Sequence, residues 1–266
     1  MPTLRTTALA MLPARAVHAY RVLHHLYFRP YEPEIREVPR FLGRDRASVE
    51  VGANVGLFAT VLARYSKRLV VFEPHPDCAE HLRRIGLRNT AIVEKAASDA
   101  LGRATLRVPL NLNTEMHALS TIDVANSFAT ERRADRIVEY VIEKTTLDAE
   151  LKTLLMAEDR VGFIKIDAEG HEHAVLMGAE HVLQRHRPVF LIELEYRHGS
   201  DVDATFRFLT SRNYHALALR DGRSLEPIDA MGLKALQSEV HLLRKLAHSS
   251  FTDYVNNVFF LPNEQS

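Results

Sequence analysis

The chain has 266 residues, 46% of them hydrophobic and 26% charged, so it is long enough to bury a full core in one large domain. Lysine plus arginine equals aspartate plus glutamate at 34 each, and this balance gives no overall reason to expect nucleic acid or an anionic membrane as a partner. The single cysteine, Cys78, excludes an intramolecular disulfide and a cysteine-rich metal site. We therefore expect a cytoplasmic globular protein.

Residues 1–46 are predicted to form an N-terminal helix and a connector. The stretch 7–12 superficially resembles an export signal, but it is too short and is soon interrupted by Pro13. The apolar pattern from Ala14 to Phe28 predicts an amphipathic helix packed on the main domain, with contact to a membrane surface as the alternative. No run approaches the roughly 20 apolar residues of a membrane span. Three prolines, at 30, 33 and 39, then interrupt the pattern.

The apolar run 48–58 turns through two glycines and continues as a helical pattern. Gly52 and Gly56 would let the backbone approach a ligand and a neighbouring strand closely. Their spacing, G-x-x-x-G, differs from the G-x-G-x-x-G turn that binds a pyrophosphate. This difference favours a nucleoside ligand without phosphates, of which S-adenosylmethionine is the obvious candidate. A turn that is merely structural is the alternative.

A second buried strand, 68–74, ends in an acid. Glu73 lies about 20 residues beyond the first glycine, where an acid at the end of the second strand can hydrogen-bond both ribose hydroxyls. A solvated glutamate at a strand end is the alternative. After a helix over 76–87, the stretch 91–99 predicts a third strand and a loop of small residues, in which Ala97 and Ser98 could lie against adenine. Turn chemistry explains Ser98-Asp99 equally well.

Two further strands are expected, at 104–108 and 137–144. Between them, residues 109–136 lose any clear periodicity, which is typical of a functional loop or of a tolerated insertion. A helix is expected from Thr146 to Leu155.

Two apolar strands that end in charged residues form the second informative region. In the segment 161–172, Lys165 and Asp167 share one side of the strand, and an ion pair is the simplest explanation of Lys165. The next strand, 189–195, places Glu193 at its end. If the two strands are neighbours, Asp167, Glu193 and His171 meet at one edge of the sheet. That group could be an acid–base site, a divalent-cation site or a partner for Lys165.

The rest of the chain continues the alternation of helices and strands. We expect a helix over 202–210, a strand over 214–219, a turn at Asp221-Gly222, an amphipathic helix over 228–246 and a closing strand over 256–262. This order predicts a doubly wound α/β sheet. We expect one domain over 47–266, with insertions at about 109–136 and 221–250.

The sequence resembles the FkbM family of S-adenosylmethionine-dependent methyltransferases. Its motifs follow the family's order over about residues 47 to 261. One departure is Glu50, where many relatives carry aspartate. The longer glutamate side chain can still reach a cofactor amine. The resemblance rests on the segments 51–56, 71–76, 146–148 and 164–172, and on Gly178-Ala179, Arg187-Pro188, Glu193 and Asn257.

The resemblance implies a Rossmann-like class I methyltransferase fold, with a mostly parallel seven-stranded sheet, a reversed last strand and helices on both faces. It implies transfer of a methyl group from S-adenosylmethionine to a hydroxyl of a sugar, glycolipid or other secondary metabolite. The cofactor-binding residues would be Glu50, Gly52, Asn54, Gly56, Glu73, Pro74, Ala97, Ser98 and Asp167, and the catalytic candidates Asp167, Glu169, His171 and Glu193.

Other interpretations stay open at this point. A nicotinamide-dependent Rossmann oxidoreductase shares the strand–turn–helix and the ribose acid but needs the three-glycine turn that is missing here. A noncatalytic cofactor-binding partner protein is the second alternative. We assign no metal ligand, although a divalent cation held by Asp167 and Glu193 is kept as an option. The acceptor would be a small molecule or glycan, and both oligomerisation and peripheral contact with a membrane are open.

Overall fold

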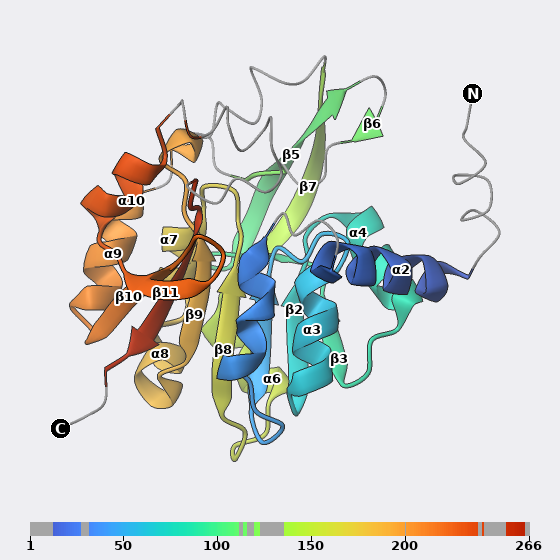
Figure 1. The fold of residues 1–266 in the computed structure, drawn as a ribbon. Helices are drawn as coiled ribbons and strands as arrows, with labels where there is room; N and C mark the ends of the chain where they lie inside the picture. Colours follow the sequence, from blue (N-terminus) through green and yellow to red (C-terminus); the bar gives the residue numbers. More distant parts are fainter. Residues whose placement is uncertain are drawn as a thin grey trace.

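The computed structural model describes residues 13–27, 32–111, 114–115, 120–122, 136–199, 201–238, 241 and 254–263. Its centre is an eight-stranded sheet (Figure 1). The strands are β1 (Ala47–Val51), β2 (Arg68–Phe72), β3 (Thr90–Val93), β8 (Val161–Ile166), β9 (Val189–Glu193), β10 (Tyr214–Arg220), β11 (Ser224–Pro227) and β12 (Asn257–Pro262).

The strand order is β11-β10-β12-β9-β8-β1-β2-β3, and neighbouring strands from β9 to β3 are parallel. The last strand, β12, runs antiparallel to both β9 and β10, as predicted. The expected count of seven strands was one too low. The eighth strand, β11, returns from β10 through a tight turn in which Asp221 and Gly222 both have positive φ, at 51° and 61°.

Helices cover both faces of this sheet, because each face carries its own set of buried apolar side chains. The cluster on one face includes residues of α3 (Leu57–Tyr65) and α4 (Pro76–Ile85), and of the short 3-10 helices η1 (Pro33–Arg36) and η2 (Val38–Phe41). The opposite cluster includes residues of α6 (Leu147–Leu154), α7 (Glu172–Met177), α8 (Glu180–His186), α9 (Val202–Thr210) and α10 (Ala230–Leu236). The predicted α/β fold with helices on both faces is confirmed.

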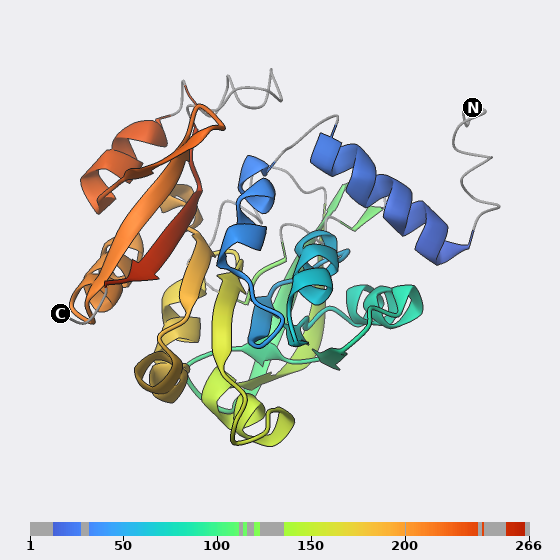
Figure 2. The same cartoon turned by 60° about the horizontal axis from the view of Figure 1, so that its bottom comes forward.

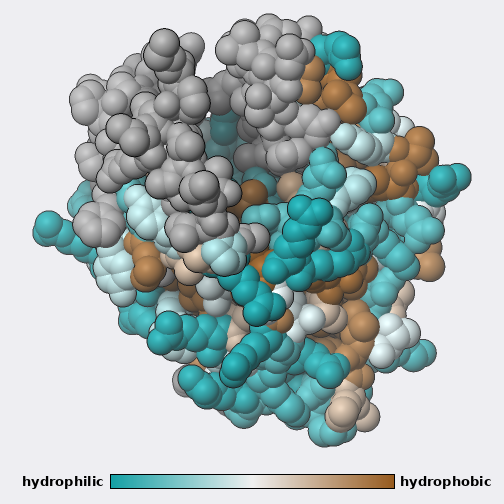
Figure 3. All heavy atoms as spheres, turned by 90° about the vertical axis from the view of Figure 1, so that its right-hand side faces the viewer, coloured by the Kyte–Doolittle hydropathy of each residue, from teal (hydrophilic) through white to brown (hydrophobic). Residues whose placement is uncertain are grey.

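The N-terminal helix α2 (Ala14–Tyr27) packs beside α4, as Figures 1 and 2 show. His18 Nε2 lies 2.7 Å from Thr60 Oγ1 of α3, and the guanidinium of Arg15 lies against Gly86, at the end of α4. The other side of α2 leaves Tyr20, Leu23 and Tyr27 exposed. On the face seen in Figure 3, hydrophobic residues form separate patches among hydrophilic ones. Among the described residues, no helix is long and apolar enough to cross a membrane.

A second sheet of four strands extends past the carboxyl edge of the main sheet (Figures 1 and 2). It contains the two additional strands predicted from the sequence, which form a long antiparallel pair. Its strand order is β4 (Ala96–Ala97), β7 (Arg136–Thr145), β5 (Gly102–Asn111) and β6 (Thr114–Glu115).

Three expectations fall wholly or partly outside the described residues. Most of the stretch 109–136 and the export-like stretch 7–12 lie there. Of the amphipathic helix expected over 228–246, α10 accounts for Ala230–Leu236.

The order of the strands fixes where a ligand site is expected. From β1 the chain moves outward to β2 and β3, and it then returns on the other side of β1 as β8. Ligands of open α/β sheets bind outside the carboxyl ends of the strands at such a reversal point. The site is therefore sought between the ends of β1 and β8.

Candidate functional site

The turn after β1 is held by positive backbone angles and by close protein neighbours. Gly52 has a φ of 76°, and a Cβ atom there would lie 1.8 Å from the carbonyl oxygen of Asp167. Gly56 has a φ of 83°, and its Cβ would lie 2.7 Å from Leu82 of α4. Asn54, between them, also has a positive φ of 49°. Both glycines are thus required by the packing of the turn itself.

Glu73 connects the turns that follow β1 and β2. One carboxylate oxygen accepts a hydrogen bond of 2.7 Å from the backbone N–H of Asn54, and the other accepts one of 2.9 Å from that of His75. The residue is 5% exposed, so the alternative of a solvated glutamate is wrong. Burial raises the pKa of Glu73 to about 7, and the two backbone hydrogen bonds oppose that shift. Pro74, the next residue, is half-buried.

An ion pair lies at the carboxyl end of β8. Lys165 is 2% exposed, and its Nζ lies 3.0 Å from Asp167 Oδ2 and 4.7 Å from the centre of the Phe58 ring. The predicted pairing of Lys165 with Asp167 is therefore present. Glu50 is opposite Lys165 in the register of the two strands and is 1% exposed. Burial raises the pKa of Glu50 to about 8, and the charge of Lys165 opposes that shift.

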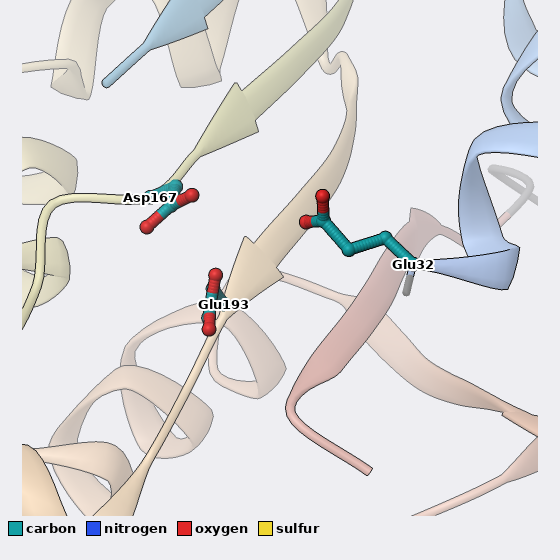
Figure 4. A group of neighbouring side chains, drawn as sticks. All are labelled: Glu32, Asp167 and Glu193. Carbon is teal, nitrogen blue, oxygen red and sulfur yellow. The ribbon is translucent and has the colours of Figure 1, made fainter. Parts of the chain in front are cut away.

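Asp167 and Glu193 meet at the ends of adjacent strands, and a third carboxylate joins them (Figure 4). This is Glu32, which precedes η1 in the connector. One carboxylate oxygen from each residue lies within 4.8 Å of the other two. Glu193 also accepts a 2.6 Å hydrogen bond from Asn256 Nδ2. Burial, followed by the charge of Asp167, raises the pKa of Glu193 well above its usual value.

The sequence analysis did not identify Glu32. The connector has no periodic pattern, and its prolines indicate only irregular backbone. The signal available was an acid in a segment that leads directly into the first strand of the sheet.

The remaining predicted residues form two separate groups. His171 Nε2 lies 3.0 Å from Ser98 Oγ, and Ser98 Oγ also donates to Asp99 Oδ1 at 2.9 Å. The structure thus places the His171 ring beside Ser98. Glu169 is paired with His198, whose Nδ1 lies 3.2 Å from Glu169 Oε2. Ala97 is 3% exposed and packs in the apolar cluster beneath α6 and α7.

We compared the chain with known proteins. No curated protein matches the sequence. Among solved structures, the chain is similar to a methyltransferase FkbM from Methylobacillus flagellatus KT, with 16% identity and a TM-score of 0.49, over 96% of this chain. The chain spans only 57% of that protein's length.

Two other solved structures are less similar. An rRNA methylase from Streptococcus thermophilus has 12% identity and a TM-score of 0.45, over 90% of this chain and 99% of that one. An O-methyltransferase from Bacillus cereus, in complex with SAH, has 13% identity and a TM-score of 0.44, over 96% and 89% of the two chains.

The sequence itself provides the stronger match. Residues 50–216, which are more than half of the chain, match the methyltransferase FkbM domain. That range contains the glycine turn, Glu73, the Lys165–Asp167 pair and Glu193, all of which lie at or beside the carboxyl ends of the central strands. The chain belongs to the FkbM methyltransferase family.

Proposed function

We propose that the protein uses S-adenosylmethionine to methylate a hydroxyl oxygen of a sugar, glycolipid or other secondary metabolite. One observation carries the proposal. The turn after β1, the acid Glu73 and the acid Asp167 meet at the point where the strand order reverses, between β1 and β8. Membership of a methyltransferase family supports the reaction type. The hydroxyl acceptor follows from the resemblance described above.

The residues of this edge fit the chemistry of the cofactor. Glu50 Oε2 is buried and accepts no hydrogen bond from any described residue, so an ammonium group such as that of the methionine part would give it a partner. Each carboxylate oxygen of Glu73 accepts one hydrogen bond from the backbone, which leaves lone pairs that could accept hydrogen bonds from the ribose hydroxyls. Gly52, Asn54 and Gly56 would lie along the methionine part, Pro74 beside the ribose, and Ala97 with Ser98 near the adenine.

The cofactor supplies an electrophilic methyl group, and the protein has to hold the acceptor oxygen and take its proton. Asp167 is the first candidate for the base, because its side chain is 23% exposed and lies at the tip of β8. Glu169, His171 and Glu193 are the other candidates. The contact of Lys165 with Asp167 fixes the orientation of this carboxylate.

The proposal extends to the organisation of the chain. Residues 47–266 would form the methyltransferase domain, and the insertions at about 109–136 and 221–250 would shape the acceptor side together with residues 1–46. We also propose a cytoplasmic location, which the single buried cysteine suits.

Replacement of Glu73 by alanine tests the cofactor site. We expect Glu73→Ala to weaken binding of S-adenosylmethionine at least tenfold in calorimetry, because the ribose hydroxyls lose their acceptor. The change also leaves two backbone N–H groups without a partner and should lower stability by about 1–3 kcal/mol.

The matched control is Glu80→Ala, on the exposed side of α4. Its cofactor affinity should equal that of the wild type. Unchanged affinity in a folded Glu73→Ala protein would remove the ribose assignment.

A further inference from the structure

We propose that Glu32, Asp167 and Glu193 bind a hard divalent cation, such as Mg²⁺ or Mn²⁺. The three side chains come from the connector, from the end of β8 and from the end of β9, and Figure 4 shows their carboxylates pointing toward one common space. Each residue is half-buried. Their mutual spacing, within 4.8 Å, matches oxygens that share an ion with bonds of about 2.0–2.6 Å.

The charges around this space favour a cation. Glu50 adds a carboxyl group near Glu32 and Asp167, and Lys165 interacts with all four acids. Within the described part of the chain, several acids therefore lie close together around Lys165, and such a group is costly in a partly buried place unless protons or cations compensate it. A set of carboxylate oxygens selects Mg²⁺, Mn²⁺ or Ca²⁺ over softer metals.

An independent observation comes from Asn257, the first residue of β12. Its side chain is 0% exposed, yet neither Nδ2 nor Oδ1 has a hydrogen-bond partner among the described residues. Asn257 is opposite Glu193 in the register of β12 and β9, so the two side chains emerge on the same side of the sheet. A buried amide without partners is rare. An ion with its bound water beside Glu193 would provide the donor and the acceptor that this amide lacks.

The ion would also act on the reaction. It would bind oxygens of the acceptor at the same edge as the cofactor turn, so it favours acceptors with two neighbouring oxygens, such as the vicinal hydroxyls of a sugar. This role rests on the proposed function, whereas binding of the ion itself does not.

The site is tested by titrating the full chain with Mn²⁺ and measuring the free ion by electron paramagnetic resonance. We expect the wild type to remove about one equivalent of Mn²⁺ from the free signal and Mg²⁺ to compete for it. Glu32→Gln should weaken Mn²⁺ binding at least tenfold. The control Glu37→Gln makes the same chemical change in the same connector, at a residue that pairs with Arg40, and should bind Mn²⁺ like the wild type.

Two readouts separate failure of the ion site from failure of the proposed function. Mn²⁺ should raise the melting temperature of the wild type and leave that of Glu32→Gln unchanged. Calorimetry with S-adenosylmethionine should give equal affinities for both proteins. Absence of Mn²⁺ binding to the wild type, or equal binding by Glu32→Gln, would overturn the ion site whatever the cofactor result.

Discussion

Asp167 is the residue on which most contacts of the site depend. Its carboxylate meets Lys165, its carbonyl oxygen leaves no room for a side chain at Gly52, and its backbone N–H donates to Val51 O at 3.1 Å. One residue therefore connects the ends of β1 and β8. A substitution that keeps its shape and removes its charge separates its chemistry from this structural role.

We expect Asp167→Asn to reduce methyl transfer by about 10²- to 10⁴-fold, whether its carboxylate takes the proton itself or holds the proposed ion, with a much smaller change in cofactor affinity. Labelled methyl incorporation into a panel of sugar and glycolipid acceptors measures the first quantity, and calorimetry measures the second. Asp159→Asn is a matched control, because it breaks a Lys–Asp pair with Lys67 at 2.7 Å outside the site. Full activity in Asp167→Asn would remove the residue from the catalytic candidates.

At the scale of elements, one motif of the sequence has a structural explanation. Asp148 lies in the first turn of α6, but its carboxylate accepts hydrogen bonds from the backbone N–H groups of His181 and Val182, at 2.9 and 3.0 Å. These residues begin α8, whose own N-cap is Ala179 and forms no side-chain cap. Asp148 thus caps a helix that follows it by about 30 residues, and its own backbone N–H donates a hydrogen bond of 3.0 Å to the carbonyl oxygen of Gly178, just before that helix.

Removal of this cap should lower the stability of the protein without changing its binding of the cofactor. We expect Asp148→Ala to lower the free energy of unfolding in urea by about 1–2 kcal/mol, the usual value for a lost N-cap, with unchanged affinity for S-adenosylmethionine. Lys152→Ala, on the exposed side of the same helix, provides the comparison. A variant as stable as the wild type would show that solvent replaces the carboxylate.

Periodic patterns allowed most elements to be predicted. The helix over 202–210 has the expected bounds, and the strand that begins at Tyr214 is one residue longer than expected, because the apolar residues of both recur with the period of their element. The strand β11 was missed because its residues are mostly exposed and lack alternation. Within the site, strand ends identified Asp167 and Glu193. Glu32 and the contact between His171 and Ser98 depend on tertiary packing, which leaves no local pattern.

For the molecule as a whole, buried acids determine how stability changes with pH. Glu172 is 2% exposed, and one of its oxygens accepts hydrogen bonds from the N–H groups of Ala168 and Gly170, while the other has no partner among the described residues. Burial raises the pKa of Glu172 to about 7. The pKa of Glu73 is raised to a similar value. Between the ordinary pKa of about 4.5 and the raised pKa of about 7, the folded state therefore holds protons that the unfolded state has released.

The raised pKa values determine whether stability rises or falls with pH. Because the folded pKa is raised, the stabilising effect of the bound proton is complete below the ordinary pKa of about 4.5 and is lost as the pH rises through about 7. We expect the melting temperature to fall from about pH 4.5 to about pH 7 and to level off above that pH. Glu172→Gln, which mimics the protonated acid, should be more stable than the wild type at pH 8 by up to about 3 kcal/mol, the equivalent of the shift.

Thermal unfolding across this pH range measures the effect. The comparison is Glu158→Gln, whose side chain is exposed and should leave the pH profile unchanged. If Glu172→Gln were less stable than the wild type at pH 8, the unpartnered oxygen would have to be satisfied by bound water in the native protein.

The connector before β1 places Glu32 in the site, and β12 places Asn257 beside it, yet both residues lie outside residues 50–216. The part of the chain that identifies the family thus contains the proposed cofactor-binding residues, while the flanking segments complete the cation site. Relatives could therefore share every motif of the common region and differ in metal requirement. For the same reason, an active-site graft or a shortened protein limited to that region would keep the donor side of the reaction and lose the ion.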